Sequence, residues 1–341
     1  MDYYYDFTQS IEEYKVVFEN LAIPWKWQPI TLDNYKFIVQ EIANELHKGE
    51  LFPVVLNLCD GDEINGAPGI SVIRALHEKN IIYTGADDFF YEITTSKIPM
   101  KLAFDEANIS TPKWEHIHQN EISATNLFQK LGKPVIVKPA VSGGSLGVGI
   151  KNVVEKETEL KQQIKKMLEG YRGWNFSSEG IIAESFIDGP EYTVMIVGSC
   201  TQPEFAKIYP PVERVFHKSL PAKERFLSFD RLWEKYEEES AMPSQENFYE
   251  YAVCKDDKKM EIQKIAWDAF AAVGGTGYTR VDVRVDQKTG TPYVLEVNAQ
   301  CGISEDENYT SIGAILKFAN QSFTELVIHI INDAFARRRK I

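Results

Sequence analysis

Two segments near the end of the chain constrain its fold more than any other feature. The first runs from Tyr278 to Val285 and the second from Tyr293 to Asn298, and both alternate between apolar and polar residues. The residues between them, 286–290, read Asp-Gln-Lys-Thr-Gly, which is the composition of a turn. This pattern predicts an antiparallel β-hairpin.

Polar side chains of this hairpin share one face. Glu296 and Asn298 are two residues apart and therefore project to the same side of their strand, and Asp282 on the first strand can lie across from them. Two carboxylates and an amide oxygen form a set of hard ligands that suits Mg²⁺. Arg280 points to the same side and could neutralise an anion there. The alternative is a solvated hairpin face, where acidic residues are common.

A glycine-rich loop, residues 142–149, is the second signal of chemistry. It follows the apolar strand Pro134–Lys138, and its glycines would let backbone N–H groups approach a phosphate closely. The loop is neither a Walker A loop nor a Rossmann fingerprint. A glycine loop can equally be only a turn, and Lys138 can be a strand-end lysine that extends to water. Glu184 and Glu191, at and beyond the end of another apolar strand, have the same ambiguity.

The first third of the chain alternates between helices and short strands. Helices are expected at 33–48, with Asp33 as cap and Gly49 as stop, and at 68–79, with strands at 52–58 and 81–85. This alternation predicts a parallel sheet covered on both faces. Because the chain starts almost directly in a helix, we expect an N-terminus that is truncated or divergent. Further helices are expected at 11–21, 96–107, 154–170 and 259–273, and further strands at 180–186, 191–197 and 203–209.

Composition excludes several classes of protein. Fifty acidic residues against 37 basic ones give the 341-residue chain a formal net charge of −13, which disfavours nucleic-acid binding. Its four cysteines are scattered, so neither a zinc site nor a disulfide framework is expected, and reduced thiols fit a cytoplasmic protein. No apolar run is long enough to predict a membrane span.

Taken together, the motifs resemble those of the ATP-grasp superfamily, and within it the D-alanine–D-alanine ligase-like branch. Their order and spacing match over roughly residues 50–335. The residues that carry the resemblance are Lys97, Lys138-Pro139, Gly143-Gly-Ser-Leu-Gly147, Glu184-Ser-Phe-Ile187, Gly189-Pro-Glu191-Tyr-Thr193, Arg280-Val-Asp282 and Glu296-Val-Asn298.

The resemblance implies an α/β fold that is α+β in its catalytic half. It implies an N-terminal α/β domain at 1–95, a central lid subdomain with the glycine-rich loop at 96–182, and a catalytic subdomain at 183–341. The polar, irregular stretch at about 210–258 would contain the family's mobile ω-loop, because a stretch of that length without a clear period is usually a functional loop.

The resemblance also implies a role for each matching residue. ATP would be bound by Lys97, Lys138, the loop residues Gly143, Gly144 and Ser145, the connecting segment Glu184, Ser185, Phe186 and Ile187, and the ribose-binding acid Glu191. Asp282, Glu296 and Asn298 would ligate two Mg²⁺ ions, with Mn²⁺ as an alternative. Arg280 would stabilise the tetrahedral intermediate, with Lys235 near the γ-phosphate and Ser145 also catalytic.

The activity implied is an ATP-dependent, ADP-forming carboxylate–amine ligase that works through an acyl phosphate on amino acids or similar acids. Its partners would be small-molecule acids and amines, with no nucleic acid or membrane, and the family resemblance implies a homodimer. The alternatives are a D-alanine–D-alanine ligase proper, an ATP-grasp kinase or ATP-binding regulator that makes no amide, and a degenerate nucleotide-binding module.

Departures from the family pattern concern the substrate. The family's histidine is absent from Asn57-Leu-Cys-Asp-Gly61, and Gly144 replaces the first of two loop serines. The acceptor side of the site would include Tyr236, Gly302, Glu305, Asp306 and Glu307. Three acids in succession would repel a carboxylate and attract a cation, so a polyamine or basic amino acid is one expectation, and a solvated acidic loop is the other.

Overall fold

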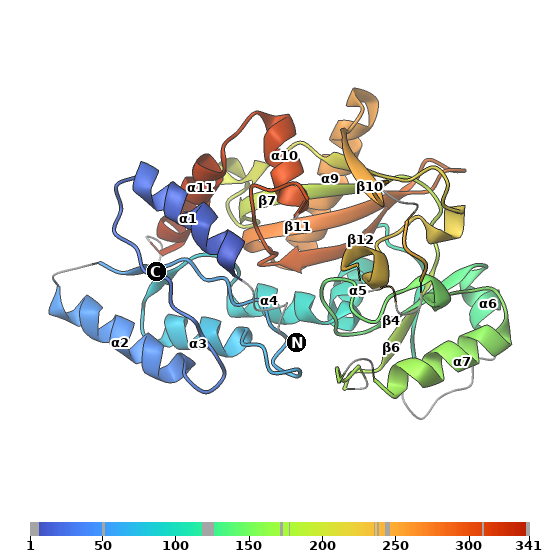
Figure 1. Cartoon of the computed structure of the whole chain (residues 1–341), viewed down its shortest axis with the longest axis horizontal. Coiled ribbons are helices and arrows are strands. Elements are labelled where there is room, and N and C mark those ends of the chain that lie inside the picture. The colour runs from blue at the N-terminus through green and yellow to red at the C-terminus, as the bar shows by residue number, and fades with distance from the viewer. Residues whose placement is uncertain are drawn as a thin grey trace.

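Three sheets organise the computed structural model, which describes residues 7–49, 52–117, 126–170, 173–176, 178–234, 236, 239–242, 246–308 and 310–338. A parallel pair, β1–β2, lies in the N-terminal part, a four-stranded sheet follows it, and a six-stranded sheet forms the centre of the molecule (Figure 1). The mixture of helices and sheets agrees with the predicted fold class.

The six-stranded sheet has the order β10–β9–β7–β11–β12, with β8 paired to β7, and all its pairings are antiparallel. Its strands are β7 (Glu191–Ser199), β8 (Lys207–Ile208), β9 (Val212–Phe216), β10 (Tyr249–Val253), β11 (Thr276–Val285) and β12 (Pro292–Ala299). β11 and β12 form the predicted hairpin. Asp282 lies opposite Glu296 and Arg280 lies opposite Asn298, so the register brings the expected chemistry together.

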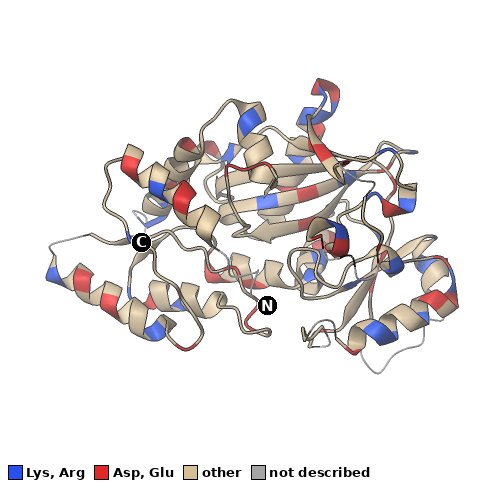
Figure 2. Ribbon diagram, viewed as in Figure 1, with Lys and Arg blue, Asp and Glu red and all other residues tan. Residues whose placement is uncertain are grey.

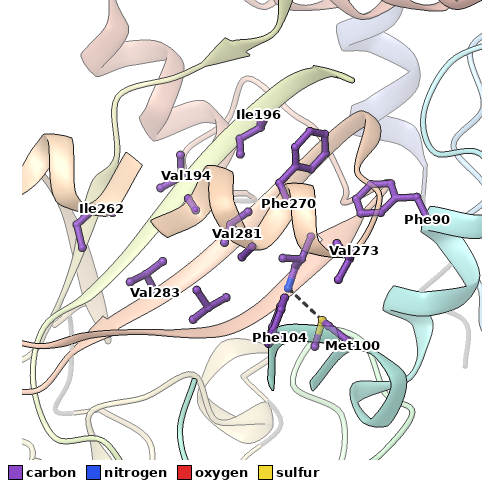
Figure 3. Close-up of a cluster of buried hydrophobic side chains, with 14 of the residues drawn as sticks. Phe90, Met100, Phe104, Val194, Ile196, Ile262, Phe270, Val273, Val281 and Val283 are labelled. Carbon is purple, nitrogen blue, oxygen red and sulfur yellow. Dashed lines mark hydrogen bonds between the residues drawn. The ribbon is translucent and has the colours of Figure 1, made fainter. Parts of the chain in front are cut away.

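One face of this sheet carries the main hydrophobic core. Valines from β11 and β12 pack there against three helices, α4 (Asp88–Thr95), α5 (Lys97–Glu106) and α9 (Asp256–Ala272) (Figure 3). The aromatic rings of Phe90 and Phe270 meet edge to face with centroids 5.5 Å apart. The amide of Val297 points to the sulfur of Met100 at 3.3 Å, which fixes α5 beneath β12. This core therefore sets where α5 and its lysines lie relative to the hairpin.

The opposite face is covered at one end by α1 (Thr8–Asn20), α10 (Ser311–Ala319) and α11 (Phe323–Arg338). α1 lies beside α11 (Figure 1). Tyr14 of α1 and Tyr278 of β11 are both almost completely buried in this second core. The remaining part of the same face, from Arg280 onward, carries the polar residues of the hairpin.

The four-stranded sheet has the order β3–β6–β4–β5, and every pairing in it is antiparallel. Its strands are β3 (Trp114–Ile117), β4 (Val135–Pro139), β5 (Val153–Val154) and β6 (Ile181–Ser185), and α6 (Leu127–Leu131) and α7 (Glu157–Leu168) accompany it. α7 buries one apolar stripe on the sheet and displays charges of both signs outside (Figure 2). The predicted domain boundary at 182/183 falls inside β6.

The N-terminal pair is shorter than predicted. β1 (Val54–Val55) and β2 (Ile82–Tyr83) are parallel, as expected, and α2 (Tyr35–Lys48) and α3 (Ile70–Glu78) accompany them. Gly49 ends α2 in the left-handed conformation, as predicted. The expectation that Asp33 caps this helix is wrong, because the residue at the cap position is Asn34.

The region at 210–258 is more regular than its sequence indicated. It contains β9, β10, the short helix α8 (Phe229–Leu232) and the 3₁₀ turn η4 (Ala222–Glu224). Conversely, the strand predicted at 203–209 is a 3₁₀ turn, η3 (Pro203–Phe205), followed only by β8. Within the described part of the chain, no helix has the length and apolar character needed to cross a membrane.

Candidate active site

Asp282, Glu296 and Asn298 form one polar cluster on the β11–β12 hairpin. The side-chain amide of Asn298 lies 3.2 Å from Asp282 Oδ2 and 3.4 Å from Glu296 Oε1. Arg280 donates to the same Asp282 oxygen from Nε at 3.2 Å. This ion pair outweighs burial of the guanidinium and raises the pKa of Arg280 above its ordinary value.

One oxygen of this cluster is unsatisfied. Asp282 Oδ1 is buried, and no described group hydrogen-bonds to it. Buried polar atoms without a partner are uncommon, and a divalent cation is one ligand that would satisfy such an oxygen. Rotation of the Asn298 amide by half a turn would present its oxygen beside the two carboxylates. The donor set therefore fits a hard cation such as Mg²⁺.

Lys97 connects the hairpin to the glycine-rich loop. Its Nζ donates to the backbone carbonyl of Ser142 at 3.2 Å and lies 3.9 Å from Glu296 Oε2. The side chain begins α5 immediately after its cap, Ser96, and burial lowers the pKa of the ammonium although Glu296 opposes that effect. Lys97 thus stands between the metal-ligand candidates and the loop expected to cover phosphates.

Lys138 is not a lysine that merely extends to water. Its Nζ lies 2.6 Å from Glu184 Oε2, while Lys101 Nζ lies 2.7 Å from the other oxygen of the same carboxylate. Burial alone would raise the pKa of Glu184, but the two ammonium groups outweigh it and hold the pKa at about 2. Glu184 is therefore ionised and fixes the direction in which Lys138 points.

Glu191 is held in the same manner by two arginines. Arg284 NH2 lies 2.7 Å from one carboxylate oxygen, and Arg214 NH1 pairs with the other. All three side chains are buried, and the two guanidinium groups outweigh burial and lower the pKa of Glu191. Its expected contact with ribose stays a prediction.

The connecting segment after β6 lies between the two larger sheets. Ser185 Oγ donates to Leu131 O at 2.6 Å, and Phe186 N donates to Pro134 O at 3.0 Å. Ile187 accepts from Arg284 NH1 at 3.2 Å, and the Arg284 guanidinium lies over the Phe186 ring. The segment is therefore tied to both sheets, and its predicted contacts with adenine remain to be tested.

The tip of the glycine-rich loop is open to solvent. Gly143 and Gly144 are exposed, and Ser145 adopts a left-handed φ of 61°. Farther along, Gly147 has φ 74°, and a Cβ there would lie 2.5 Å from the Phe176 ring. Glycine is required at this position both for its conformation and for the close approach.

Hydrogen bonds join the glycine-rich loop and the residues just after it to the predicted ω-loop. Trp233 Nε1 donates to Gly144 O at 2.9 Å, and Phe229 N donates to Val148 O at 2.8 Å. Ile150 N donates to Glu239 Oε1 at 2.7 Å. A small apolar cluster lies between the two segments; it consists of Leu146, Phe176 and Phe229 with Trp174 and Trp233 at its edge. Tyr236 is exposed, and Lys235 lies outside the described residues.

The three acids proposed for the acceptor side have separate surroundings. Glu305 is exposed, Asp306 accepts from Asn308 and from Gln9 of α1, and Glu307 pairs with Lys317 at 2.8 Å. Gly302 is also exposed. These contacts give Asp306 and Glu307 a part in holding the loop, and their role toward a substrate stays a prediction.

Three ion-pair residues of the site were missed in the sequence. Lys101 is four residues after Lys97 and so shares its face of a helix, which was a usable signal. Arg284 continues the i, i+2 series of Arg280 and Asp282 on one strand. Arg214 lies on the same buried face of β9 as Val212 and Phe216, two residues away on either side, which is a weak pattern in a stretch whose sequence predicts an irregular loop.

Comparisons with known proteins agree with this geometry. A D-alanine–D-alanine ligase of Clostridium beijerinckii is 26% identical over 322 residues, which are 89% of this chain and 93% of the relative. A relative of the same name from Idiomarina loihiensis is 26% identical over 270 residues, covering 78% of this chain and 76% of its own. The crystal structure of D-alanine–D-alanine ligase from Bacillus anthracis complexed with ATP superposes with a TM-score of 0.65 at 21% identity, covering 98% and 94% of the two chains.

The ATP-grasp fold predicted from the motifs is confirmed by that superposition, and the predicted class of ATP-dependent, ADP-forming ligase is confirmed by the named relatives. A family model described as D-ala D-ala ligase C-terminus matches residues 103–332. This match runs from within α5 to within α11 and includes both partners of every ion pair described above except those made by Lys97 and Lys101. The chain therefore belongs to the family of D-alanine–D-alanine ligase C-terminal domains.

Proposed function

We propose that the chain is an ATP- and Mg²⁺-dependent carboxylate–amine ligase that joins amino acids or similar acids through an acyl phosphate. The observation that carries the proposal is the hairpin cluster, where a buried aspartate oxygen lacks a partner beside a second carboxylate, an arginine and a lysine. Family membership supports the reaction class, because the relatives are named ligases.

Asp282, Glu296 and Asn298 would hold the metal. Bound Mg²⁺ supplies positive charge to the phosphate oxygens during phosphoryl transfer. Lys97 and Lys138 add point charges directed to the nucleotide phosphates, and Glu184 keeps Lys138 in place. The exposed N–H groups at Gly143 and Gly144 would contact phosphate from the other side.

Arg280 would act on the acyl group. Its guanidinium is held by Asp282 and keeps its charge, since the pKa of Arg280 is raised. When an amine attacks the acyl phosphate, negative charge develops on the acyl oxygen, and a fixed cation beside it lowers the barrier. The joined loops would exclude water, which otherwise hydrolyses the acyl phosphate.

The test is a screen of acid and amine pairs that follows ADP release and identifies products by mass. Pairs of D- and L-amino acids are included, with two D-alanines as one pair. A ligase releases ADP only when both the acid and the amine are present, and the product has lost one water relative to the pair. ADP release with an acid alone, together with a stable phosphorylated product, would instead identify a kinase.

We also propose, from the family resemblance, that the chain forms a homodimer in the cytoplasm. Light scattering coupled to gel filtration tests the dimer, because a mass near 78 kDa would be about twice the 38.9 kDa of the chain.

A further inference from the structure

Gln300 connects the N-terminal strands to the metal-ligand strand. It directly follows β12, two residues after Asn298, and only 1% of its surface is exposed. Its side-chain Nε2 donates to Cys59 O at 3.0 Å, and its Oε1 accepts from Ala86 N at 3.2 Å. Both partners are backbone groups that follow the ends of β1 and β2. One buried amide therefore links both strand ends to the hairpin.

The backbone around Gln300 is unusual in the same place. Gln300 itself has a left-handed φ of 55°, and a Cβ at Gly85 would lie 2.3 Å from its Oε1. A non-glycine residue in this conformation is strained, and such strain concentrates where a structure needs one particular placement. The close approach leaves no room for a side chain at Gly85, so a glycine there allows the Gln300 amide to reach Ala86 N.

The hydrogen bond from Gln300 to Cys59 fixes the backbone next to Asp60. Asp60 follows Cys59 directly, and the next residue, Gly61, is fixed by a 2.8 Å hydrogen bond from the Tyr91 hydroxyl. The backbone on both sides of Asp60 is thus anchored. Its carboxylate, however, makes no hydrogen bond or ion pair with another side chain among the described residues, and it keeps exposed surface.

Asp60 lies beside the end of the metal-ligand strand, because it follows Cys59, whose carbonyl accepts from Gln300 two residues after Asn298. Burial raises the pKa of Cys301 to about 12, and both Asp282 and Asp60 add to that increase while Arg280 opposes it. Although Asp60 keeps exposed surface, the protein packed around it raises its own pKa to about 6.

We propose that Asp60 binds the ammonium group of an amino-acid substrate and that Gln300 positions it. This inference rests on the proposed ligase function and specifies its substrate class. The α-ammonium of an amino acid is two bonds from its carboxyl carbon, so a fixed carboxylate beside the reaction site can bind the ammonium while the carboxyl group reacts. Asp60 has no cation of the described protein as partner, and the substrate supplies one.

The direct test compares Asp60→Asn with the wild type. The substrates are alanine, or whichever amino acid the screen turns over fastest, and the α-hydroxy acid of the same side chain, which is lactate for alanine. The variant should lose about tenfold to a hundredfold in kcat/KM for the amino acid, with the KM for ATP and the turnover of the hydroxy acid nearly unchanged. Glu78→Gln, an exposed charge on α3, is the matched control for net charge.

A second variant tests the positioning role. Gln300→Met keeps the size of the side chain but removes both hydrogen bonds, and it should reduce the preference for the amino acid over the hydroxy acid by about tenfold. In the double variant with Asp60→Asn the losses should not multiply, because both act through one contact. If Gln300→Met does not fold, Gln300→Glu, which keeps the acceptor for Ala86, replaces it.

The outcomes separate the two proposals. Wild-type protein that joins no pair of acid and amine contradicts the ligase proposal, and a ligase that accepts only acids without an ammonium group overturns the present inference. An active wild type whose preference for amino acid over hydroxy acid is unchanged in Asp60→Asn overturns the present inference alone. A lower melting temperature in Gln300→Met with the preference intact assigns Gln300 a purely structural role.

Discussion

Two buried carboxylates on neighbouring sheets have opposite surroundings. Glu184, on the four-stranded sheet, has a lysine at each oxygen, at 2.6 and 2.7 Å. Asp282, on the six-stranded sheet, shares one oxygen with Arg280 and leaves the other without a partner. An acid whose charges are fully compensated within the chain can only position its partners. An acid that has a buried oxygen without a partner in the chain can bind a cation from outside.

The largest effect expected from this contrast is on stability. Glu184→Gln should lower the free energy of unfolding by about 3–5 kcal/mol, because it leaves the buried Lys101 ammonium without its counter-charge. Urea unfolding measures the change. Adding Lys101→Met should recover most of the loss, and a Glu184→Gln protein as stable as the wild type would show that the pair is not strongly coupled.

The same pair predicts a dependence of stability on pH. The folded-state pKa of Glu184 is about 2, below its ordinary value of 4.5, so its contribution is present above about pH 4.5 and disappears as pH falls toward 2. The melting temperature of the wild type should fall over this range more steeply than that of Glu184→Gln. Parallel curves for the two proteins would contradict the assignment.

Glu296→Gln should reduce turnover strongly and leave stability nearly unchanged, the reverse of Glu184→Gln. Turnover should fall at least about a hundredfold, equal to about 2.7 kcal/mol, because a charge is lost from the metal ligands without loss of volume. The melting temperature should change little, because Glu296 is partly exposed and its nearest lysine is 3.9 Å away. Turnover close to that of the wild type would remove the metal assignment.

Lys138→Ala should produce a smaller, mixed effect. The variant loses a point charge toward the phosphates, so the KM for ATP should rise and turnover should fall, each by about tenfold. Lys101 still compensates Glu184, and the protein should remain folded. If neither constant changes, Lys138 serves only to complete the ion pairs of Glu184.

The three acids after the hairpin should matter least. Replacing Glu305, Asp306 and Glu307 with Gln, Asn and Gln should change the ratio of turnover between cationic and neutral amines by no more than about fivefold, since Glu305 is exposed and screened by solvent and Glu307 is already paired with Lys317. The measurement is that ratio in the ligase screen. An unchanged ratio would limit these acids to their contacts with Gln9, Asn308 and Lys317.

The hairpin could be predicted from the sequence because its information is local. Alternation predicts its two strands, and the i, i+2 rule places Glu296 and Asn298 on one face, where Asp282 pairs with Glu296 and Arg280 with Asn298. The strand at 52–58 was predicted too long for a reason that the sequence does not display. After Val55 the ladder ends, because Asn57 N bonds to the side-chain oxygen of Thr84 instead of a backbone carbonyl.

The ion-pair partners were harder to predict than the motifs. The sequence identifies Glu184 and Glu191 as candidate site residues, but no local pattern predicts which lysines and arginines form ion pairs with them. Lys101 meets Glu184 only because Met100 and Phe104 fix α5 beneath the central sheet. Arg214 meets Glu191 only because β9 pairs with β7, in a stretch whose sequence shows no clear period. These partners depend on tertiary packing, which spacing alone does not contain.

The contacts between the glycine-rich loop and the ω-loop have a kinetic consequence. Because Trp233, Phe229 and Glu239 each hydrogen-bond to the loop or the turn after it, neither segment can swing away without breaking the contacts to the other. Entry of nucleotide and exit of product would then share one opening event with a single rate constant. A probe placed on either segment should report the same relaxation time, and that time would set the upper limit on turnover.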